Sequence, residues 1–116
     1  MSNYKQLSQR VDNLSAAIAA EEKRLEEAKA NYSRNQAELD GILGTFKQRL
    51  LEGKETLLAK LEARISELQR DMRRDSALTE GLDEKIPTMH AELEAIDLEK
   101  NEAFAKLAHK WLLREV

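Results

Sequence analysis

The chain has 116 residues, of which 35% are charged and only 4% aromatic, and its formal net charge at pH 7 is −3. This length suffices for one domain but not for two ordinary ones, and the lack of cysteine excludes disulfides, thiol nucleophiles and cysteine-ligated metal sites. A composition rich in Ala, Glu, Lys, Leu and Arg is typical of long helices or coiled coils. We therefore expect a single all-α domain over residues 1–116.

The first predicted helix covers about residues 3–40. Its apolar side chains recur mainly at steps of three and four residues, which places them on one helical stripe. The members of this stripe are Leu7, Val11, Leu14, Ile18, Leu25, Ala28, Tyr32 and Leu39. Two polar residues, Glu21 and Asn35, interrupt it. A polar residue at such a position either fixes the register of helix pairing at a cost in stability or faces water, and the pattern leaves both interpretations open.

The second predicted helix covers about residues 45–75 and carries the broadest apolar stripe of the chain. A break is expected before it, because Gly41 and Gly44 each weaken a helix by about 1 kcal/mol relative to Ala and Thr45 can cap a new helix. The apolar period runs through Gly53 without a shift, so we expect the helix to continue there.

The third predicted helix covers about residues 83–114. A turn or a disordered corner is expected within 75–87, because Asp75 puts a polar residue on the stripe and Pro87 lacks the N–H that a helix interior needs. The apolar residues that resume at Leu78 also look out of phase with the stripe before them.

Three such helices predict an elongated antiparallel three-helix bundle, or coiled coil, in which the broad faces of the second and third helices meet. The alternative is a helical hairpin with one long second helix, from about 55 to 114, whose apolar overhang is covered by another chain. In the bundle Trp111 packs on Phe46, whereas in the hairpin Trp111 is free for a partner.

Few residues are candidates for chemistry. His90 has Glu94 one turn on, a possible pair of metal ligands, but a surface histidine beside a glutamate is more often simply solvated. A catalytic carboxylate pair needs a concave, partly dry pocket, which a slim helical bundle rarely offers, and no Gly-rich phosphate loop is present. We therefore predict no enzymatic activity, no cofactor and no metal.

One basic cluster is a candidate for contacts with phosphate or with an acidic partner. It consists of Arg64, Arg70, Arg73 and Arg74. Arginine forks suit phosphate and carboxylate recognition, but Glu67, Asp71 and Asp75 interleave with the cluster and can neutralise it. Binding to nucleic acid therefore ranks below binding to protein.

The surplus of apolar residues points to protein partners. The candidate partner-binding residues are Leu51, Leu58, Leu98, Phe104, Trp111, Leu112 and Leu113. We predict a non-enzymatic helical protein–protein interaction module that acts as an adaptor, assembly factor or scaffold and forms a homo-oligomer. The alternatives are a nucleic-acid-associated helical protein and a holdase-like chaperone. No signal-peptide core or membrane-length apolar run is visible, so a cytoplasmic location is expected.

Overall fold

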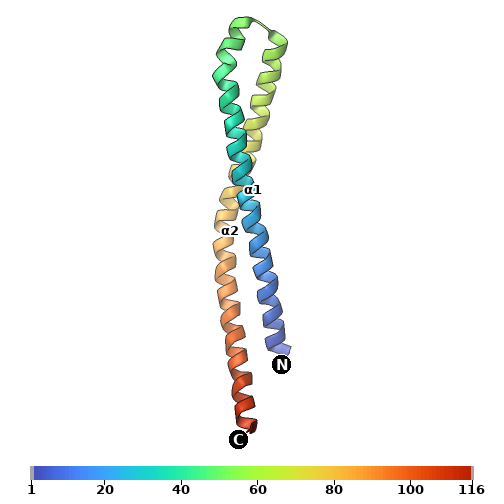
Figure 1. Ribbon diagram of the computed structural model, residues 1–116, viewed down its shortest axis with the longest axis vertical. Helices are drawn as coiled ribbons and strands as arrows, with labels where there is room; N and C mark the ends of the chain where they lie inside the picture. The colour runs from blue at the N-terminus through green and yellow to red at the C-terminus, as the bar shows by residue number, and fades with distance from the viewer. Residues whose placement is uncertain (1, 116) are drawn as a thin grey trace. The chain divides into compact units, whose positions relative to one another are not determined.

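Two long helices make up the part of the chain that the computed structural model describes, which is residues 2–115 for the backbone and 3–112 for the side chains. Helix α1 spans Ser2–Glu52 and helix α2 spans Glu55–Glu115. Only Gly53 and Lys54 connect them, at the green turn in Figure 1. The all-helical prediction is confirmed for these residues.

The contacts within the chain divide it into two compact units, Met1–Lys23 with Asp83–Val116, and Arg24–Leu82. Each unit pairs a segment of α1 with a segment of α2 (Figure 1). In the first unit Tyr4 contacts Phe104, whereas Glu21 contacts Lys85. As the residue number increases along α1, the number of the contacting residue on α2 decreases, so the two segments are antiparallel. The second unit is a helical hairpin around Gly53 and Lys54.

A continuous seam explains why both helices are so long. On α2 the buried and half-buried side chains alternate at steps of four and three residues throughout, which keeps one stripe facing a partner helix. These α2 seam positions are Leu61, Ile65, Leu68, Met72, Asp75, Thr79, Leu82, Ile86, Met89, Leu93, Ile96, Lys100, Ala103 and Leu107. On α1 the same alternation runs from Tyr4 to Arg49 and includes both Glu21 and Asn35.

Each unit has its own buried side chains along this seam. In the hairpin unit Leu39, Leu68 and Met72 form a cluster against which Ile42 and Ile65 pack, and Leu68 is fully buried. In the other unit the buried apolar side chains are Leu7, Ile18, Ile86 and Ile96. A fully buried leucine stabilises a fold by about 1.5–3 kcal/mol relative to an exposed one.

The structure differs from the predicted three-helix bundle and fits the alternative hairpin. The break expected at Gly41 and Gly44 is wrong, because α1 continues through both glycines. Thr45 does not begin a helix: its hydroxyl donates to the carbonyls of Gly41 and Ile42, at 3.4 and 3.2 Å. Two glycines inside a helix cost stability. Burial of the neighbouring seam side chains Leu39 and Ile42 offsets this cost.

The break expected within 75–87 is also wrong, because α2 passes through this range. Asp75 and Thr79 occupy seam positions, so the stripe keeps its phase although these two side chains are polar. Pro87 lies on the exposed side of α2 between Ile86 and Met89, which are seam residues. Seam burial on both sides offsets the cost of an interior proline, which is about 3 kcal/mol.

The one break between the helices falls at Gly53, where we expected the helix to continue. Gly53 has a φ of 70°, a left-handed conformation that glycine adopts at little cost. Its N–H donates to the carbonyl of Leu50 at 3.2 Å, and the N–H of Leu58 donates to the carbonyl of Lys54 at 3.0 Å at the start of α2. Leu50 and Leu51 are exposed here, so no buried seam holds the helix together.

Candidate functional site

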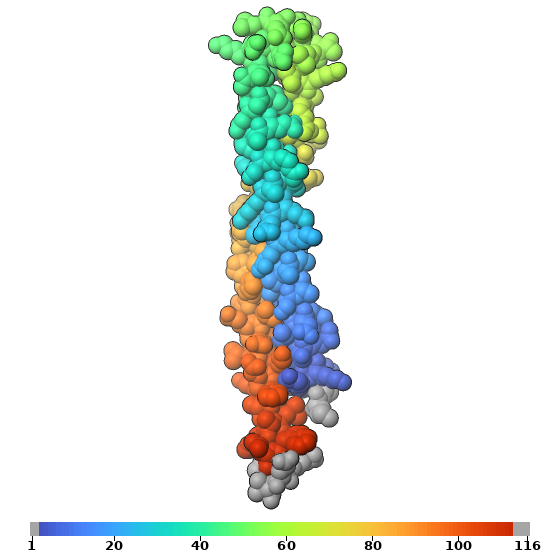
Figure 2. Space-filling model, in the orientation of Figure 1, coloured from blue at the N-terminus to red at the C-terminus, as the bar shows by residue number. Residues whose placement is uncertain are grey.

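The last described turns of α2 expose large apolar side chains. Trp111 and Leu112 are each 67% exposed, and Leu98 and Phe104 are also exposed. These four residues define the C-terminal apolar surface. Figure 2 shows this red end of α2 extending past the blue start of α1, its partner in the same unit. Leu107 and Lys110 still line a groove with Asn3 and Tyr4, the first described side chains of α1, and two of the predicted binding residues, Trp111 and Leu112, follow them in α2.

A second stripe on α2 accounts for this exposure. Its members recur at steps of three, four, three and four residues, and we call them the outer stripe: Leu98, Asn101, Ala105, Ala108 and Leu112. At about 100° per residue the outer stripe lies about 150° around α2 from the seam, on nearly the opposite side of the helix. Phe104 and Trp111 lie between the two stripes. α1 covers the seam and contacts Phe104 through Tyr4, whereas four of the five side chains of the outer stripe, all but that of Ala108, are exposed.

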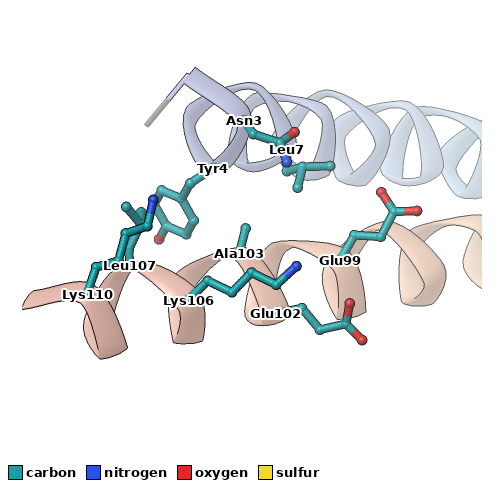
Figure 3. Close-up of a pocket in the computed structure, with 9 residues that line it drawn as sticks. All are labelled: Asn3, Tyr4, Leu7, Glu99, Glu102, Ala103, Lys106, Leu107 and Lys110. Atoms are coloured by element: carbon teal, nitrogen blue, oxygen red, sulfur yellow. The ribbon is translucent and has the colours of Figure 1, made fainter. Parts of the chain in front are cut away.

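A groove borders the C-terminal apolar surface on the α1 side (Figure 3). The groove has a volume of about 350 Å³, and its apolar lining includes Tyr4 and Leu7 of α1 and Leu107 of α2. Tyr4 points toward α2 in Figure 3, and its ring centroid lies 5.8 Å from that of Phe104 with the ring planes tilted by 45°. An aromatic pair of this geometry contributes about 0.5–1.5 kcal/mol beyond its buried area.

Charged side chains along this groove are sorted by sign. Glu99 and Glu102 lie at one end of its α2 wall, and Lys106 and Lys110 lie at the other. A helix segment with an acidic and a basic half favours a partner segment that runs in the opposite direction and carries the same order of charges.

The remaining predicted binding residues are not part of the C-terminal apolar surface. Leu51 is 83% exposed and Leu58 is half-buried, and both belong to the hairpin unit near its turn. The side chain of Leu113 lies outside the described residues. Leu43 and Leu50 of the hairpin unit are exposed as well, because each lies one residue after a seam position, Ile42 and Arg49 respectively.

The predicted arginine cluster is partly neutralised. Arg64 donates to both carboxylate oxygens of Glu38, through Nε and through Nη2, the second at 2.9 Å from Oε1. Its Nη1 also lies 3.3 Å from Oε1 of Glu67. The hydrogen bond from Arg64 lowers the pKa of Glu38, and the guanidinium charge adds to this effect.

The arginines also do not share one surface. Arg64 and Arg74 line a polar groove together with Asp71 and Asp75. Arg73 lines a different pocket, beside Tyr32 and Met72 of the seam. Asp71 and Asp75 thus line the same groove as two of the four arginines.

The polar seam residues lie within the helix pairs. The Glu21 side chain is 13% exposed, and its Oε2 lies 3.2 Å from Nζ of Lys85 on the other helix. Asn35 is half-buried and lines the polar groove with Asp75, which is 5% exposed. A polar seam residue either fixes the register of the helix pair or faces water. The burial of Glu21 and Asn35 favours the first interpretation.

His90 pairs across the helices and not along α2. Its Nε2 lies 3.0 Å from Oε1 of Glu22 in α1. Among the described residues, no three His, Asp or Glu side chains are grouped so that they could hold a metal ion. Neither helix, over its described residues, contains a stretch long and apolar enough to cross a membrane.

Comparisons of the chain with protein-family models, with curated proteins and with solved structures return no match.

Proposed function

We propose that this chain is a non-enzymatic helical protein–protein interaction module that acts as an adaptor, assembly factor or scaffold. The observation that carries the proposal is the exposure of Leu98, Phe104, Trp111 and Leu112 on one short segment of α2. Contiguous exposed apolar side chains on a folded protein mark binding surfaces.

The types and spacing of these residues support recognition by a helix or a helical groove. Leu98 and Leu112 lie on the outer stripe, and Phe104 and Trp111 lie seven residues apart beside it, so the four side chains present one side of α2 to a partner. Tryptophan is among the residues that contribute most to interface affinity when a partner buries it. The charged residues that flank the surface, Glu102 and Lys106, supply a polar rim that restricts which partners fit.

Capture of binding proteins from an extract of the native host tests this function. The full chain is compared with a Trp111→Ser/Leu112→Asp double variant, and Ala95→Asp serves as the matched control. Ala95 is an exposed alanine of the same helix and lies outside the outer stripe. Circular dichroism is used to check that all three chains are helical.

We expect the wild type and Ala95→Asp to capture the same proteins in similar amounts. The double variant should capture at least tenfold less of each protein. Equal capture by all three chains would show that the C-terminal apolar surface does not bind the partner. Capture of no protein above background by the wild type would remove the proposed function altogether.

A further inference from the structure

We propose that a second copy of this chain covers the C-terminal apolar surface, and that residues 98–112 of the two copies pair as antiparallel helices. This inference rests on the proposed function, since it names the occupant of the same surface. Three observations carry it: the two leucines placed symmetrically about the centre of the outer stripe, the order of the charges beside it, and its exposure.

The ends of the outer stripe are symmetric about its centre, Ala105, because Leu98 and Leu112 each lie seven residues from it, whereas Asn101 and Ala108 differ in type and in distance from it. Leu98 and Leu112 are its outer members, Asn101 and Ala108 come next, and Ala105 is its centre. A two-fold axis at Ala105 therefore sets Leu98 of one copy against Leu112 of the other. Small side chains meet in the middle, where they allow the two helices to approach closely. A surface that is complementary to itself in this way is what a two-fold dimer requires.

Charge order selects the antiparallel direction. Glu102 flanks the outer stripe on one side, and Lys106 and His109 follow it on that side. With the axis at Ala105, Glu102 of one copy lies near Lys106 and His109 of the other, so opposite charges meet. A parallel pair would instead set Asp97 of one copy beside Glu102 of the other, which are like charges flanking the same stripe.

The aromatic side chains gain cover in the same arrangement. Phe104 lies next to the axis, so the two copies of this ring approach each other along one edge of the stripe. Trp111 of one copy reaches the region of Asp97 and Leu98 in the other. The paired segments are short, about 22 Å at 1.5 Å per residue, so their interface is near the lower limit of about 1,000 Å² for a specific one. We expect a dimer that forms at micromolar concentrations.

Sedimentation equilibrium of the full chain over a range of micromolar concentrations tests the dimer. Ala105→Asp places two carboxylates against each other at the axis, and we expect it to weaken association more than tenfold. Ala105 is exposed in the single chain, so the variant keeps its fold. Ala95→Asp adds the same charge off the stripe and should associate like the wild type. A wild type that is monomeric throughout, or equal association of both variants, overturns the proposal.

Charge exchange and cross-linking test the direction. Glu102→Lys and the double variant Lys106→Glu/His109→Glu should each associate weakly alone and pair when mixed. Since the chain has no cysteine, Leu98→Cys mixed with Leu112→Cys should form the mixed disulfide in preference to either symmetric one. Preferred symmetric disulfides would show a parallel pair and overturn the proposal.

Failure of this inference and failure of the proposed function give different results. A monomeric wild type that still captures host proteins through Trp111 and Leu112 removes the second copy as the occupant but keeps the interaction module. A monomeric wild type that captures nothing removes both.

Discussion

The hairpin core and the C-terminal apolar surface contain similar side chains in opposite environments. Leu39, Leu68 and Met72 are buried, whereas Leu98 and Trp111 are mostly exposed. The first group lies on the seam, and one neighbouring helix covers it. The second group lies off the seam, where that helix cannot reach. The phase of an apolar residue within the repeat, more than its size, therefore decides whether a two-helix protein buries it.

A matched pair of truncations tests this contrast and has the largest expected effect on stability. Leu68→Ala removes a fully buried side chain and should lower the free energy of unfolding by about 2–5 kcal/mol. Leu112→Ala removes the same atoms from an exposed position and should change it by less than about 0.5 kcal/mol. Urea denaturation followed by circular dichroism, at concentrations too low for association, measures both. Similar losses would mean that phase does not control burial here.

Two glycine-to-alanine variants, with a smaller expected effect on stability, separate the contribution of backbone conformation from that of packing. Adding a Cβ at Gly53 or at Gly81 meets no atom within 4 Å, so the two sites differ only in their backbone. Gly53→Ala should lower the free energy of unfolding by about 1–2 kcal/mol, because an L residue is strained at its positive φ. Gly81→Ala, inside α2, should raise it by about 1 kcal/mol. The same denaturation assay measures both, and a stabilising Gly53→Ala would contradict the turn.

The smallest effect concerns the ion pair of the hairpin unit and depends on pH. The pKa of Glu38 is lowered in the folded chain by its hydrogen bond with Arg64. Its contribution to stability is therefore present above its unfolded pKa and is lost as the pH falls through the folded value. Glu38→Gln should be slightly less stable than wild type near pH 7, and the difference should shrink toward about pH 3.

Paired urea titrations of wild type and Glu38→Gln at the two pH values measure this difference. Glu62→Gln is the control, since Glu62 is an exposed glutamate of the same hairpin unit. A difference for Glu38→Gln that is the same at both pH values would show that the pair with Arg64 does not contribute through its charge.

The sequence predicted the helical class and most of the seam, because the spacing of Leu7, Ile18, Leu39 and Leu68 depends only on helix geometry. It misplaced the turn for a physical reason. Glycine and proline weaken a helix locally, but seam burial on either side decides whether the helix continues. Pro87 lies beside such burial, and Gly53 does not.

The candidate surface was predicted in part. Leu98, Phe104, Trp111 and Leu112 were identified because they exceed what one stripe needs. Their grouping into an outer stripe was missed, since it requires knowing which helix positions α1 covers. Leu43 and Leu50 were missed because a leucine one residue off the seam looks identical, in sequence, to a leucine on it.

The short connection at Gly53 and Lys54 also sets an order for folding. Glu38 and Arg64 are 26 residues apart in the chain, whereas Glu21 and Lys85 are 64 apart. Closing the longer loop costs about 0.8 kcal/mol more in chain entropy if it happens first. We therefore expect the hairpin beside Gly53 to form early, and pairing to extend from it residue by residue toward the chain ends. The segment that carries Trp111 then becomes ordered last, and it is the part of the chain that stays accessible longest during folding.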